Sequence, residues 1–267
     1  MSIATTAADR RLTLDRQALI RRLREVLPAA ALLAEEEEMR PYDCDGLTAY
    51  RQLPLLVALP ENEAQAQAIL RVCYELRVPV VARGAATGLS GGATPHRDGV
   101  LVSLAKLKKI VRVDPLSRTA VVQPGVRNLS VSEAAAPYGL YYAPDPSSQI
   151  ACTIGGNVAE NAGGVHCLKY GLTVHNVLRV RALTIEGEIV EFGNAALDAP
   201  GYDLLALLNG SEGLLAMITE VTVRLTPKPE LAQVVIASFA DVRRAGDAVA
   251  SIIAAGIIPA GLEMMDK

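Results

Sequence analysis

The sequence predicts an α+β protein, and three observations lead to this fold class. Short apolar runs typical of strands occur in clusters, with few helical patterns between them. Residues 55–81 read as strand, helix and strand, which is a β-α-β opening. Pro227 and Pro229 then separate this strand-rich region from a short final segment. The 267 residues have room for one large or two small domains.

Residues 1–54 are predicted to form a helical segment ahead of the main domain. Asp15 is a suitable cap for a helix in which Leu19 and Leu23 share one face before a proline ends it. The acidic run Glu35–Glu38 is interpreted as a solvated helix face.

The main domain is predicted over residues 55–226, as two subdomains of about 55–110 and 111–226. In the first subdomain, strands are expected at 55–59, 78–81 and 100–104, with a helix at 63–76. In the second, strands are expected at 110–113, 119–122, 177–185, 188–192 and 217–225. Asp114-Pro115 and Glu186-Gly187 are turn sequences that join neighbouring strands.

Residues 227–267 are predicted to begin a further α+β domain. A strand is expected at 234–239, and a helix with one apolar stripe follows it. The stripe consists of Ala245, Ala248, Val249, Ile252 and Ile253. About 40 residues with one strand and one helix cannot bury a core on their own, so this domain is expected to be incomplete.

The composition argues against several classes of partner and site. With a formal net charge of −3 and no Trp, the chain lacks the basic field and stacking platforms that nucleic acids need. No apolar run approaches the roughly 18 residues of a membrane span, and we recognise no secretion signal. The four cysteines form no Cys-x-x-Cys pair, which predicts no metal site and a cytoplasmic protein. Cys73 shares a helical stripe with Ile69 and Val72, which predicts a core position.

The most informative motif is a glycine-rich loop that directly follows the apolar run at 78–81. It consists of Arg83, Gly84, Ala85, Ala86, Thr87, Gly88, Leu89, Ser90, Gly91 and Gly92. Glycines lack the Cβ atom that would hold a ligand away from the backbone, so these amides can converge on a pyrophosphate. Thr87 and Ser90 add hydroxyl donors, and Arg83 adds a positive charge. The spacing matches neither the Rossmann fingerprint nor the P-loop, and an ordinary surface loop is the alternative.

A second stretch rich in glycine and proline runs from Tyr142 to Gly164, and its length indicates a ligand-binding loop. Its glycines permit close approach to a flat ring, and its polar side chains can bond the heteroatoms of that ring. These residues are Gly155, Gly156, Gly163 and Gly164, with Thr153, Asn157 and Asn161. A loop suited to a pyrophosphate and a second loop suited to a flat ring together fit a flavin dinucleotide, FAD.

Five ordered motifs resemble the FAD-linked oxidases of the vanillyl-alcohol oxidase type, which carry a PCMH-type FAD-binding domain. The motifs are Arg83–Gly92, Pro144–Ser148, Ile154–Asn157 with Asn161–Gly164, His166–Gly171, and Gly210–Gly213 followed by Ile218–Val221. Within that family the chain is similar to the flavin subunits of bacterial glycolate oxidase and to the D-lactate and D-2-hydroxyglutarate dehydrogenases.

The resemblance implies two α+β subdomains with FAD between them, and it assigns three groups of residues to the cofactor. The pyrophosphate falls to Gly84 through Gly92. The flavin ring falls to Pro144, Asp145, Ser148, Gly155, Gly156, Asn161, Gly163 and Gly164. The adenine or ribose side falls to Glu212, Gly213, Ile218, Thr219 and Glu220. Ala93 stands where relatives with covalent FAD often carry His, so the resemblance implies non-covalent FAD.

For the whole enzyme, the resemblance implies oxidation of a small D-2-hydroxy acid, glycolate or D-lactate, to the 2-oxo acid. A hydride would pass to flavin N5, and electrons would pass onward to a partner subunit or a quinone. The implied setting is a glycolate-oxidase-type complex with an iron-sulfur subunit, in the cytoplasm or at the inner membrane through partners. The catalytic base of such enzymes lies in the C-terminal cap domain, beyond Lys267, so no catalytic residue is assigned.

Three alternatives stay open. The first is a non-catalytic FAD-binding module, folded and loaded but without the cap that carries the base. The second is a flavin-free structural subunit of the same kind of complex. The third is a reductase of the cell-wall precursor type, which would need a different C-terminal domain.

Three histidines and two neighbouring side chains are further candidates for the cofactor site. His166 lies in the second glycine-rich region and is the candidate for the flavin's edge, whereas His96 is expected at an exposed turn and His175 in a structural position. Lys169 is open to two interpretations, a charge that favours an anion or a solvated side chain. Tyr170 is likewise open to cofactor contact or ordinary packing.

Overall fold

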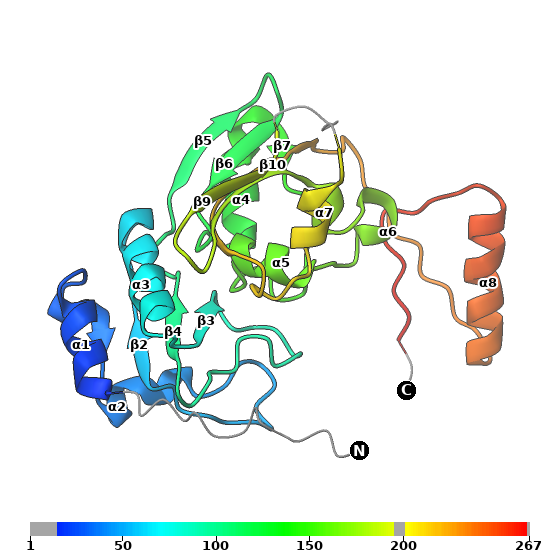
Figure 1. The fold of residues 1–267 in the computed structure, drawn as a ribbon. Coiled ribbons are helices and arrows are strands. Elements are labelled where there is room, and N and C mark those ends of the chain that lie inside the picture. Colours follow the sequence, from blue (N-terminus) through cyan, green and yellow to red (C-terminus); the bar gives the residue numbers. More distant parts are fainter. Residues whose placement is uncertain (1–14, 195–200, 266–267) are drawn as a thin grey trace, which may run out of the picture.

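The structure, a computed structural model, describes residues 15–194 and 201–265. Two main β-sheets with helices packed against them confirm the α+β class (Figure 1). No helix in these two ranges is both long enough and apolar enough to cross a membrane.

The first sheet has four short strands in the order β1-β2-β4-β3. Their bounds are β1 (Leu32–Leu33), β2 (Leu56–Ala58), β3 (Val80–Arg83) and β4 (Val100–Ser103). β2 and β3 both run parallel to β4, so Leu56 and Val80 are both paired with Val100. Helix α3 (Glu63–Glu75) joins β2 to β3, which confirms the predicted β-α-β unit and places a third parallel strand inside it. The first glycine-rich loop leaves this sheet at the carboxyl end of β3.

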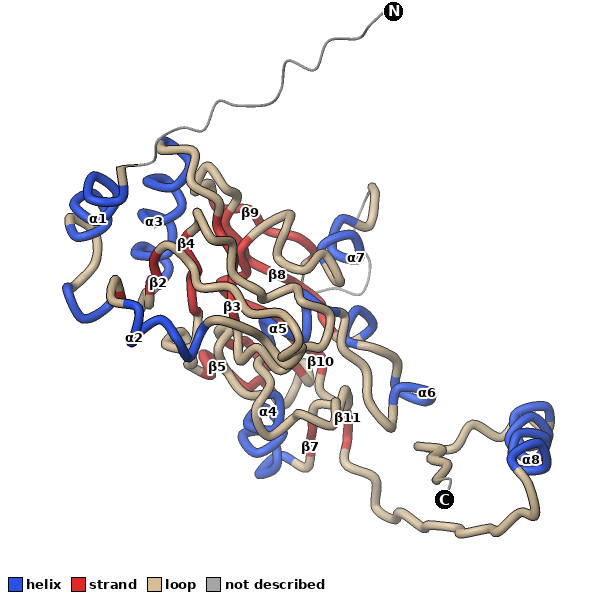
Figure 2. Tube along the Cα trace, turned by 90° about the horizontal axis from the view of Figure 1, so that it is seen from below, coloured by secondary structure: helices blue, strands red, loops and turns tan. Residues whose placement is uncertain are grey.

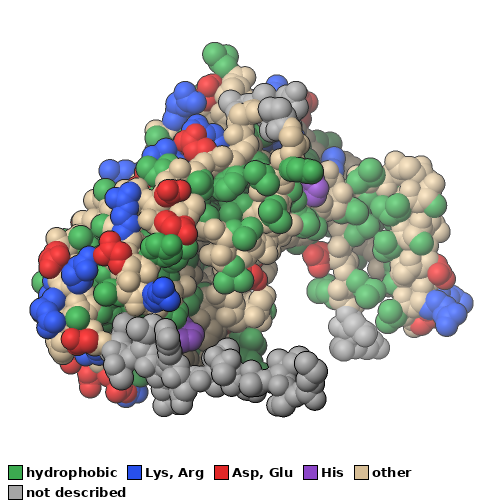
Figure 3. All heavy atoms as spheres, in the orientation of Figure 1, with side chains coloured by type: hydrophobic (Ala, Val, Ile, Leu, Met, Phe, Trp, Pro, Cys, Tyr) green, Lys and Arg blue, Asp and Glu red, His purple; other side chains and the backbone are tan. Residues whose placement is uncertain are grey.

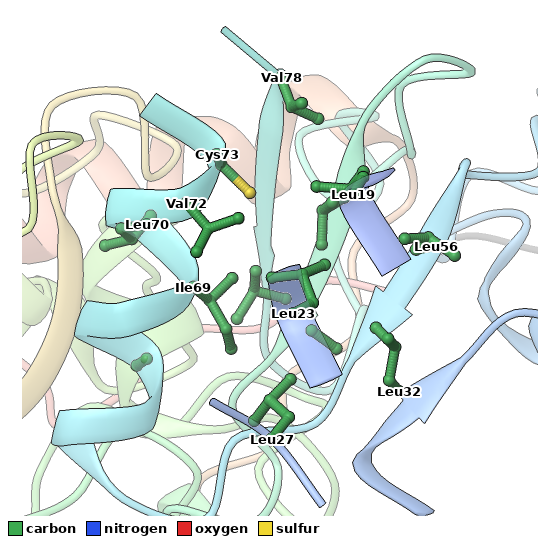
Figure 4. Close-up of a cluster of buried hydrophobic side chains, with 14 of the residues drawn as sticks. Leu19, Leu23, Leu27, Leu32, Leu56, Ile69, Leu70, Val72, Cys73 and Val78 are labelled. Carbon is green, nitrogen blue, oxygen red and sulfur yellow. The ribbon is translucent and has the colours of Figure 1, made fainter. Parts of the chain in front are cut away.

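Helices α1 (Arg16–Arg24) and α3 pack next to each other against this sheet, and their apolar faces form its core. Leu19, Leu23 and Ile69 are fully buried, and Figure 4 shows them around Leu56 of β2. Cys73 lies in the same cluster, as predicted, and burial raises its thiol pKa to about 12. The Asp15 carboxylate caps α1 by accepting hydrogen bonds from two backbone N–H groups. The acidic side chains of α2 (Glu36–Met39) lie in solvent, as expected.

The second sheet has five antiparallel strands in the order β5-β6-β10-β8-β9. Their bounds are β5 (Ile110–Asp114), β6 (Thr119–Val122), β8 (Val177–Leu183), β9 (Ile189–Gly193) and β10 (Met217–Arg224). Both predicted turns are confirmed. The Asp114 carboxylate accepts hydrogen bonds from the N–H groups of Leu116 and Ser117, and Gly187 adopts a positive φ of 76°.

Three helices contribute to the core of the second sheet, α4 (Asn128–Ala135), α5 (Ile154–Glu160) and α7 (Leu204–Leu208). Helix α5 lies within residues 142–164, which the sequence predicts to be a loop throughout. Its fully buried Ile154 and Val158 pack into the cluster that contains Val180 and Val221. Further short elements include β7 (Leu140–Tyr141), α6 (Cys167–Tyr170) and β11 (Thr226–Pro227), and β11 pairs with β7. Four short 3-10 helices also occur, η1 (Ala29–Ala31), η2 (Arg40–Tyr42), η3 (Ala136–Tyr138) and η4 (Thr173–His175).

The two subdomains are joined by a charged contact at the start of α3. Glu63 of α3 receives two hydrogen bonds from the guanidinium of Arg181 on β8, at 2.8 and 2.9 Å. The Thr219 hydroxyl of β10 donates to the same carboxylate at 2.6 Å. Leu183 of β8 and Met217 of β10 are buried in the core of the first subdomain. The strands of the second sheet therefore help to build the core of the first subdomain.

The C-terminal segment projects from the rest of the chain (Figures 1 and 2). The strand predicted at 234–239 is wrong, since residues 228–240 contain no helix or strand and Val235 is 90% exposed. A strand needs a neighbour for its backbone hydrogen bonds, and no strand of the described ranges lies beside these residues. Helix α8 (Val242–Ala254) forms where predicted, but none of its side chains is buried. Hydrophobic atoms are consequently visible over this segment in Figure 3.

Candidate functional site

A cleft runs between the first glycine-rich loop and helix α5, where the two subdomains meet. It has two adjoining parts that share Ala82, Gly84, Thr153, Gly156, Ala159 and Glu212. One part continues past Ala85, Ala86, Thr87, Gly88, Gly92 and Ala93 to Pro146, Ser148, Cys152, Asn157, Glu160 and Ala162. The other continues past Arg83, Leu104 and Pro124 to Gly155, Gly213, Ala216 and Ile218. Both segments that the sequence predicts as cofactor loops therefore line one continuous cleft.

The two segments touch at Gly84 and Thr153. A Cβ atom at position 84 would overlap the Thr153 hydroxyl oxygen, so only glycine allows this approach. A Cβ atom at Gly155 would lie 2.6 Å from the Cβ of Pro124, which also requires glycine. Thr153 is the N-cap of α5, and its hydroxyl accepts a long hydrogen bond of 3.4 Å from the Gly156 N–H. The first turn of α5 is thus fixed against the floor of the cleft.

Two carboxylates occupy the space above the other glycines of the first loop. A Cβ atom at Gly88 would overlap the carboxylate of Glu160, and one at Gly92 would overlap that of Glu212. Burial raises the pKa of Glu160 above its usual value, and the nearby charges of Glu212 and Asp45 raise it further. This part of the first loop therefore faces acidic side chains, which the sequence did not predict.

The guanidinium of Arg83 is directed to another part of the fold. Its Nη1 donates to the Tyr42 carbonyl at 3.0 Å, and its Cζ lies 5.4 Å from the centre of the Tyr42 ring. Burial lowers the pKa of Arg83. The backbone of Arg83 lies at the cleft, while its side chain ties the first loop to the segment before β2.

Asn157 provides a direct test of whether the cleft is suited to a polar cofactor. It lines the cleft and is 3% exposed, and its Nδ2 has no hydrogen-bond partner within the described chain. An unpaired buried donor is unfavourable by about 1–3 kcal/mol, and a polar ligand atom in the cleft would satisfy it. Together with the glycine-lined wall, this donor fits a nucleotide-type cofactor such as FAD.

Asp145 of the Pro144–Ser148 motif contacts His166 of the His166–Gly171 motif. The Asp145 carboxylate lies 2.6 Å from Nδ1 of His166 and also accepts from the His166 backbone N–H at 3.2 Å. A Cβ atom at Gly164 would overlap the Asp145 carbonyl, so the two loops are in close contact. Tyr170 packs beside this pair, 6.4 Å from the His166 ring centre. Asp145 and His166 are not in the cleft wall, but Pro146, which follows Asp145 in the sequence, is.

Several residues predicted for the cofactor lie outside the cleft wall. These are Leu89, Ser90, Gly91, Pro144, Asp145, Asn161, Gly163, Gly164, Tyr170, Thr219 and Glu220. Leu89 and Ser90 are exposed, Asn161 is the left-handed C-cap of α5, and the Thr219 hydroxyl bonds Glu63. The structure brings the other predicted residues together along the cleft.

Other cleft residues were not predicted from the sequence. Glu160 could have been found once α5 was recognised, because it follows Asn157 by three positions and so shares its helical face. Cys152 also lines the cleft, and burial raises its pKa, so the thiol stays protonated at neutral pH.

The remaining polar candidates lie away from the cleft wall. His96 is exposed, and its ring nitrogen accepts from the Asp98 N–H at 3.1 Å. His175 accepts from the Leu172 N–H at 3.0 Å, which supports a structural position. Lys169 is exposed and its Nζ lies 5.5 Å from the centre of the Tyr170 ring.

Two family descriptions match the chain, an FAD binding domain over residues 54–193 and the C-terminal domain of FAD linked oxidases over residues 228–267. The chain is 62% identical over 253 residues to glycolate oxidase subunit GlcD of Escherichia coli K12, covering 95% of this chain and 51% of that protein. It is 38% identical over 213 residues to a D-lactate dehydrogenase of Archaeoglobus fulgidus, covering 79% and 47%.

The chain spans about half the length of the curated relatives it matches. Among solved structures, an alkyldihydroxyacetonephosphate synthase with 20% sequence identity matches with a TM-score of 0.79. That match covers 92% of this chain and 47% of the synthase, and it shows a shared fold.

Proposed function

Because the chain belongs to the FAD binding domain family, which residues 54–193 match, we propose that it holds FAD non-covalently in the cleft between its two glycine-rich segments. One observation carries this proposal. The first loop and α5 meet at Gly84 and Thr153 and form one continuous cleft, and the unpaired Nδ2 donor of Asn157 lies in its wall. In this proposal the cofactor lies between the two α+β subdomains, as in a PCMH-type FAD-binding domain.

Different residues of the cleft are suited to different parts of such a cofactor. Backbone amides from Gly84 onward in the first loop are donors suited to a pyrophosphate, whereas Ile154 and Gly155 at the start of α5 already donate to the carbonyls of Val126 and Pro124. Leu104, Pro124 and Ile218 give one end of the cleft an apolar lining that suits the adenine ring. Pro146, Ser148 and Ala162 line the opposite end, where the flavin ring would lie. Ala93 offers no nucleophile, which supports a non-covalent cofactor.

In the whole protein, the proposed reaction is oxidation of a small D-2-hydroxy acid, glycolate or D-lactate, to the 2-oxo acid. FAD supplies the acceptor for the hydride that leaves the carbinol carbon. The names of the relatives support this substrate class, since they include a glycolate oxidase subunit and a D-lactate dehydrogenase. The word subunit in the first name also supports assembly with other chains, and an iron-sulfur partner and a peripheral place at the inner membrane belong to this proposal.

The described residues bind and orient the cofactor, and they include no assigned base for the substrate hydroxyl. His166 is the titratable side chain nearest to this role, because Asp145 fixes its Nδ1 and leaves Nε2 available. His166 is the N-cap of α6. The C-terminal segment lies close to the preceding residue, because a Cβ atom at Gly261 would lie 2.7 Å from Cγ1 of Val165. Substrate would therefore approach between the flavin end of the cleft and the C-terminal segment.

A second candidate is a non-catalytic FAD-binding module. The specific observation in its favour is the C-terminal segment, whose helix α8 buries no side chain and whose residues 234–236 are 88–91% exposed. Such a segment does not by itself enclose a substrate.

The response of FAD-loaded protein to substrate distinguishes the two candidates. It is measured as steady-state reduction of an artificial dye and as bleaching of the bound flavin. Substrate-dependent bleaching of the flavin by D-lactate or glycolate supports the dehydrogenase. Flavin that dithionite reduces but neither acid bleaches supports the module. Protein that binds no FAD contradicts both.

A further inference from the structure

The first glycine-rich loop has few contacts of its own that fix its shape. Residues 84–93 form neither helix nor strand, and none of their N–H groups donates to a backbone carbonyl within residues 15–194 and 201–265. Ala86, with a φ of 55°, and Gly91, with a φ of 79°, lie in the left-handed region. Free amides suit an anion, but a backbone of this kind keeps one shape only where neighbouring residues hold it.

The segment Tyr42–Leu47, named here the bracing segment, lies against this loop. A Cβ atom at Gly46 would lie 2.6 Å from the carbonyl oxygen of Gly88 and 3.0 Å from that of Thr87. Both of these neighbours are backbone atoms, so they cannot turn aside as the end of a flexible side chain can. The backbone of the bracing segment is therefore in direct contact with the backbone of the loop.

The bracing segment is itself attached to the first sheet. The side chain of Tyr42 packs in a cluster with Val57 of β2 and Leu101 of β4. Successive side chains of a strand point to opposite faces, so this cluster covers the face that α1 and α3 leave free. The Gln52 N–H also donates to the Asp43 carbonyl at 2.7 Å, which closes the loop that the segment begins. The bracing segment is thus a fixed support.

Asp45 shapes the turn that brings Gly46 to the first loop. It is 5% exposed, and its Oδ1 accepts a hydrogen bond of 2.8 Å from the Leu47 N–H. The charge of Asp45 also contributes to the raised pKa of Glu160, which lines the cleft. The bracing segment therefore lies close behind the cleft wall.

Arg83 connects the bracing segment to the start of the loop. Its backbone is fixed in the sheet, because Arg83 of β3 pairs with Ser103 of β4. Its side chain donates to the Tyr42 carbonyl and lies over the Tyr42 ring, a cation–π contact. Asp43 and Asp45 are close enough to stabilise the charge of the guanidinium. The interactions of this cation are thus with the bracing segment.

We propose that Tyr42 and Arg83 are positioning residues for the cofactor, which with Gly46 hold the first loop in the shape that directs its free amides to the pyrophosphate of FAD. The inference rests on the proposed FAD site. It gives Arg83 a role through Tyr42 in place of the direct phosphate contact that the sequence suggests. A loop ordered before binding loses less conformational entropy on binding, so its support raises affinity without touching the ligand.

The test measures dissociation constants of FAD and ADP for the apo-form of the whole protein, by flavin fluorescence quenching and by competition. Both ligands carry the pyrophosphate. The variants are Tyr42→Ala, Arg83→Met and the double variant, and Tyr42→Phe is the conservative replacement that keeps the ring. Met39→Ala is the matched control, because Met39 belongs to the same apolar cluster as Tyr42. Melting curves of the apo-proteins verify that each variant is folded.

Tyr42→Ala and Arg83→Met are each expected to weaken FAD and ADP by about tenfold. Because the two residues act through one contact, the double variant should also be weaker by about tenfold, and not by the product of the two effects. Tyr42→Phe should restore the wild-type affinity. Met39→Ala should lower the melting temperature of the apo-protein and leave both dissociation constants unchanged.

Gly46→Ala tests the same support without changing Tyr42 or Arg83. Its methyl group meets the Gly88 carbonyl, so FAD and ADP should bind more than about tenfold more weakly. Gly246→Ala, which adds a methyl group in open space on α8, should bind both ligands as wild type does.

Three results would overturn the inference. Independent, additive losses for Tyr42→Ala and Arg83→Met would mean that Arg83 binds the cofactor itself. An equal loss of affinity in Met39→Ala would reduce the effect to general destabilisation. Wild-type affinity in Tyr42→Ala, Arg83→Met and Gly46→Ala would show that the loop keeps its shape without this support. If the wild-type protein binds neither FAD nor ADP, the proposed function itself fails, which is a separate outcome.

Discussion

Gly84 of the first loop and Thr153 at the start of α5 are so close that a Cβ atom on Gly84 would overlap the Thr153 hydroxyl. These residues belong to different subdomains and lie 69 positions apart in the sequence. Their contact sets the separation of the cleft walls, because the first loop continues along α5 from this point. Any side chain at position 84 must therefore push the two subdomains apart or reshape the cleft.

The substitution Gly84→Val is expected to weaken FAD binding by more than tenfold while the two sheets stay folded. The added side chain displaces Thr153 and shifts the first loop, whose amides are expected to bind the cofactor's phosphates. Isothermal titration with FAD measures the change, and circular dichroism reports the fold.

Gly246→Ala is the matched control for that variant. Gly246 lies in α8 with open space around its Cα, so an added methyl group meets nothing. Its FAD affinity should equal that of wild type. Equal affinities for Gly84→Val and wild type would show that the contact with Thr153 does not shape the cofactor site.

The ion pair between Glu63 and Arg181 is expected to stabilise the junction of the subdomains, with a coupling free energy of about 1–2 kcal/mol. A double-mutant cycle with Glu63→Gln and Arg181→Met, measured by urea unfolding, gives this value. The pair Arg22 and Glu75, at 2.7 Å on the surface, is the control and should show a weaker coupling. A zero coupling for Glu63 and Arg181 would contradict their role at the junction.

The same pair predicts a dependence of stability on pH. The hydrogen bond from Arg181 lowers the folded-state pKa of Glu63 below its ordinary value of 4.5. Its contribution is therefore complete above about pH 4.5 and is lost as the pH falls through the folded-state pKa. Wild type should be more stable than Glu63→Gln at pH 7, and the difference should shrink on acidification. A difference that is constant or grows between pH 5 and pH 3 would contradict this assignment.

Leu183 links the two subdomains through packing. It lies on β8 of the second sheet, is fully buried, and belongs to the core of the first subdomain. Leu183→Ala is expected to reduce the free energy of unfolding by about 2–4 kcal/mol. Leu116→Ala, at a position that is 97% exposed, should change it little. Equal unfolding free energies for Leu183→Ala and wild type would place the subdomain boundary elsewhere.

The strands and helices with strong periodic patterns were predictable from the sequence. The helix predicted at 63–76 matches α3 (Glu63–Glu75) closely. The turn at Asp114 forms through its side-chain hydrogen bonds, and the turn at Gly187 forms because glycine accepts a positive φ. Helix α5 was missed because it contains Gly155 and Gly156, which are poor helix formers. Its stability comes from the Thr153 cap and from tertiary packing, which local propensity does not reveal.

The candidate site was predictable in its location and less so in its contacts. Glycines mark close approach, but the sequence does not say what approaches. Here the neighbours are Thr153, Glu160 and Glu212, brought in from distant positions. Thr219, predicted for the adenine side, bonds Glu63 instead, and that pairing spans 156 residues. Contacts of this range depend on how the two sheets pack, which no local pattern encodes.

Bound FAD should raise the free energy of unfolding by about 2.7 kcal/mol when the free cofactor is a hundredfold above its dissociation constant. A series of urea unfolding curves at increasing FAD concentration measures this linkage. Addition of AMP at the same concentrations is the control, because it lacks both the pyrophosphate and the flavin. Curves that do not shift with FAD would argue against a specific site.

The visible absorption spectrum of the purified protein, recorded with added FAD after removal of free ligand and again after acid precipitation, tests the FAD cleft most directly. We predict a flavin spectrum that stays with the folded protein and moves completely into the supernatant when acid unfolds it. Flavin that remains in the pellet would contradict the non-covalent assignment. Protein that stays colourless with excess FAD would contradict the cofactor site itself.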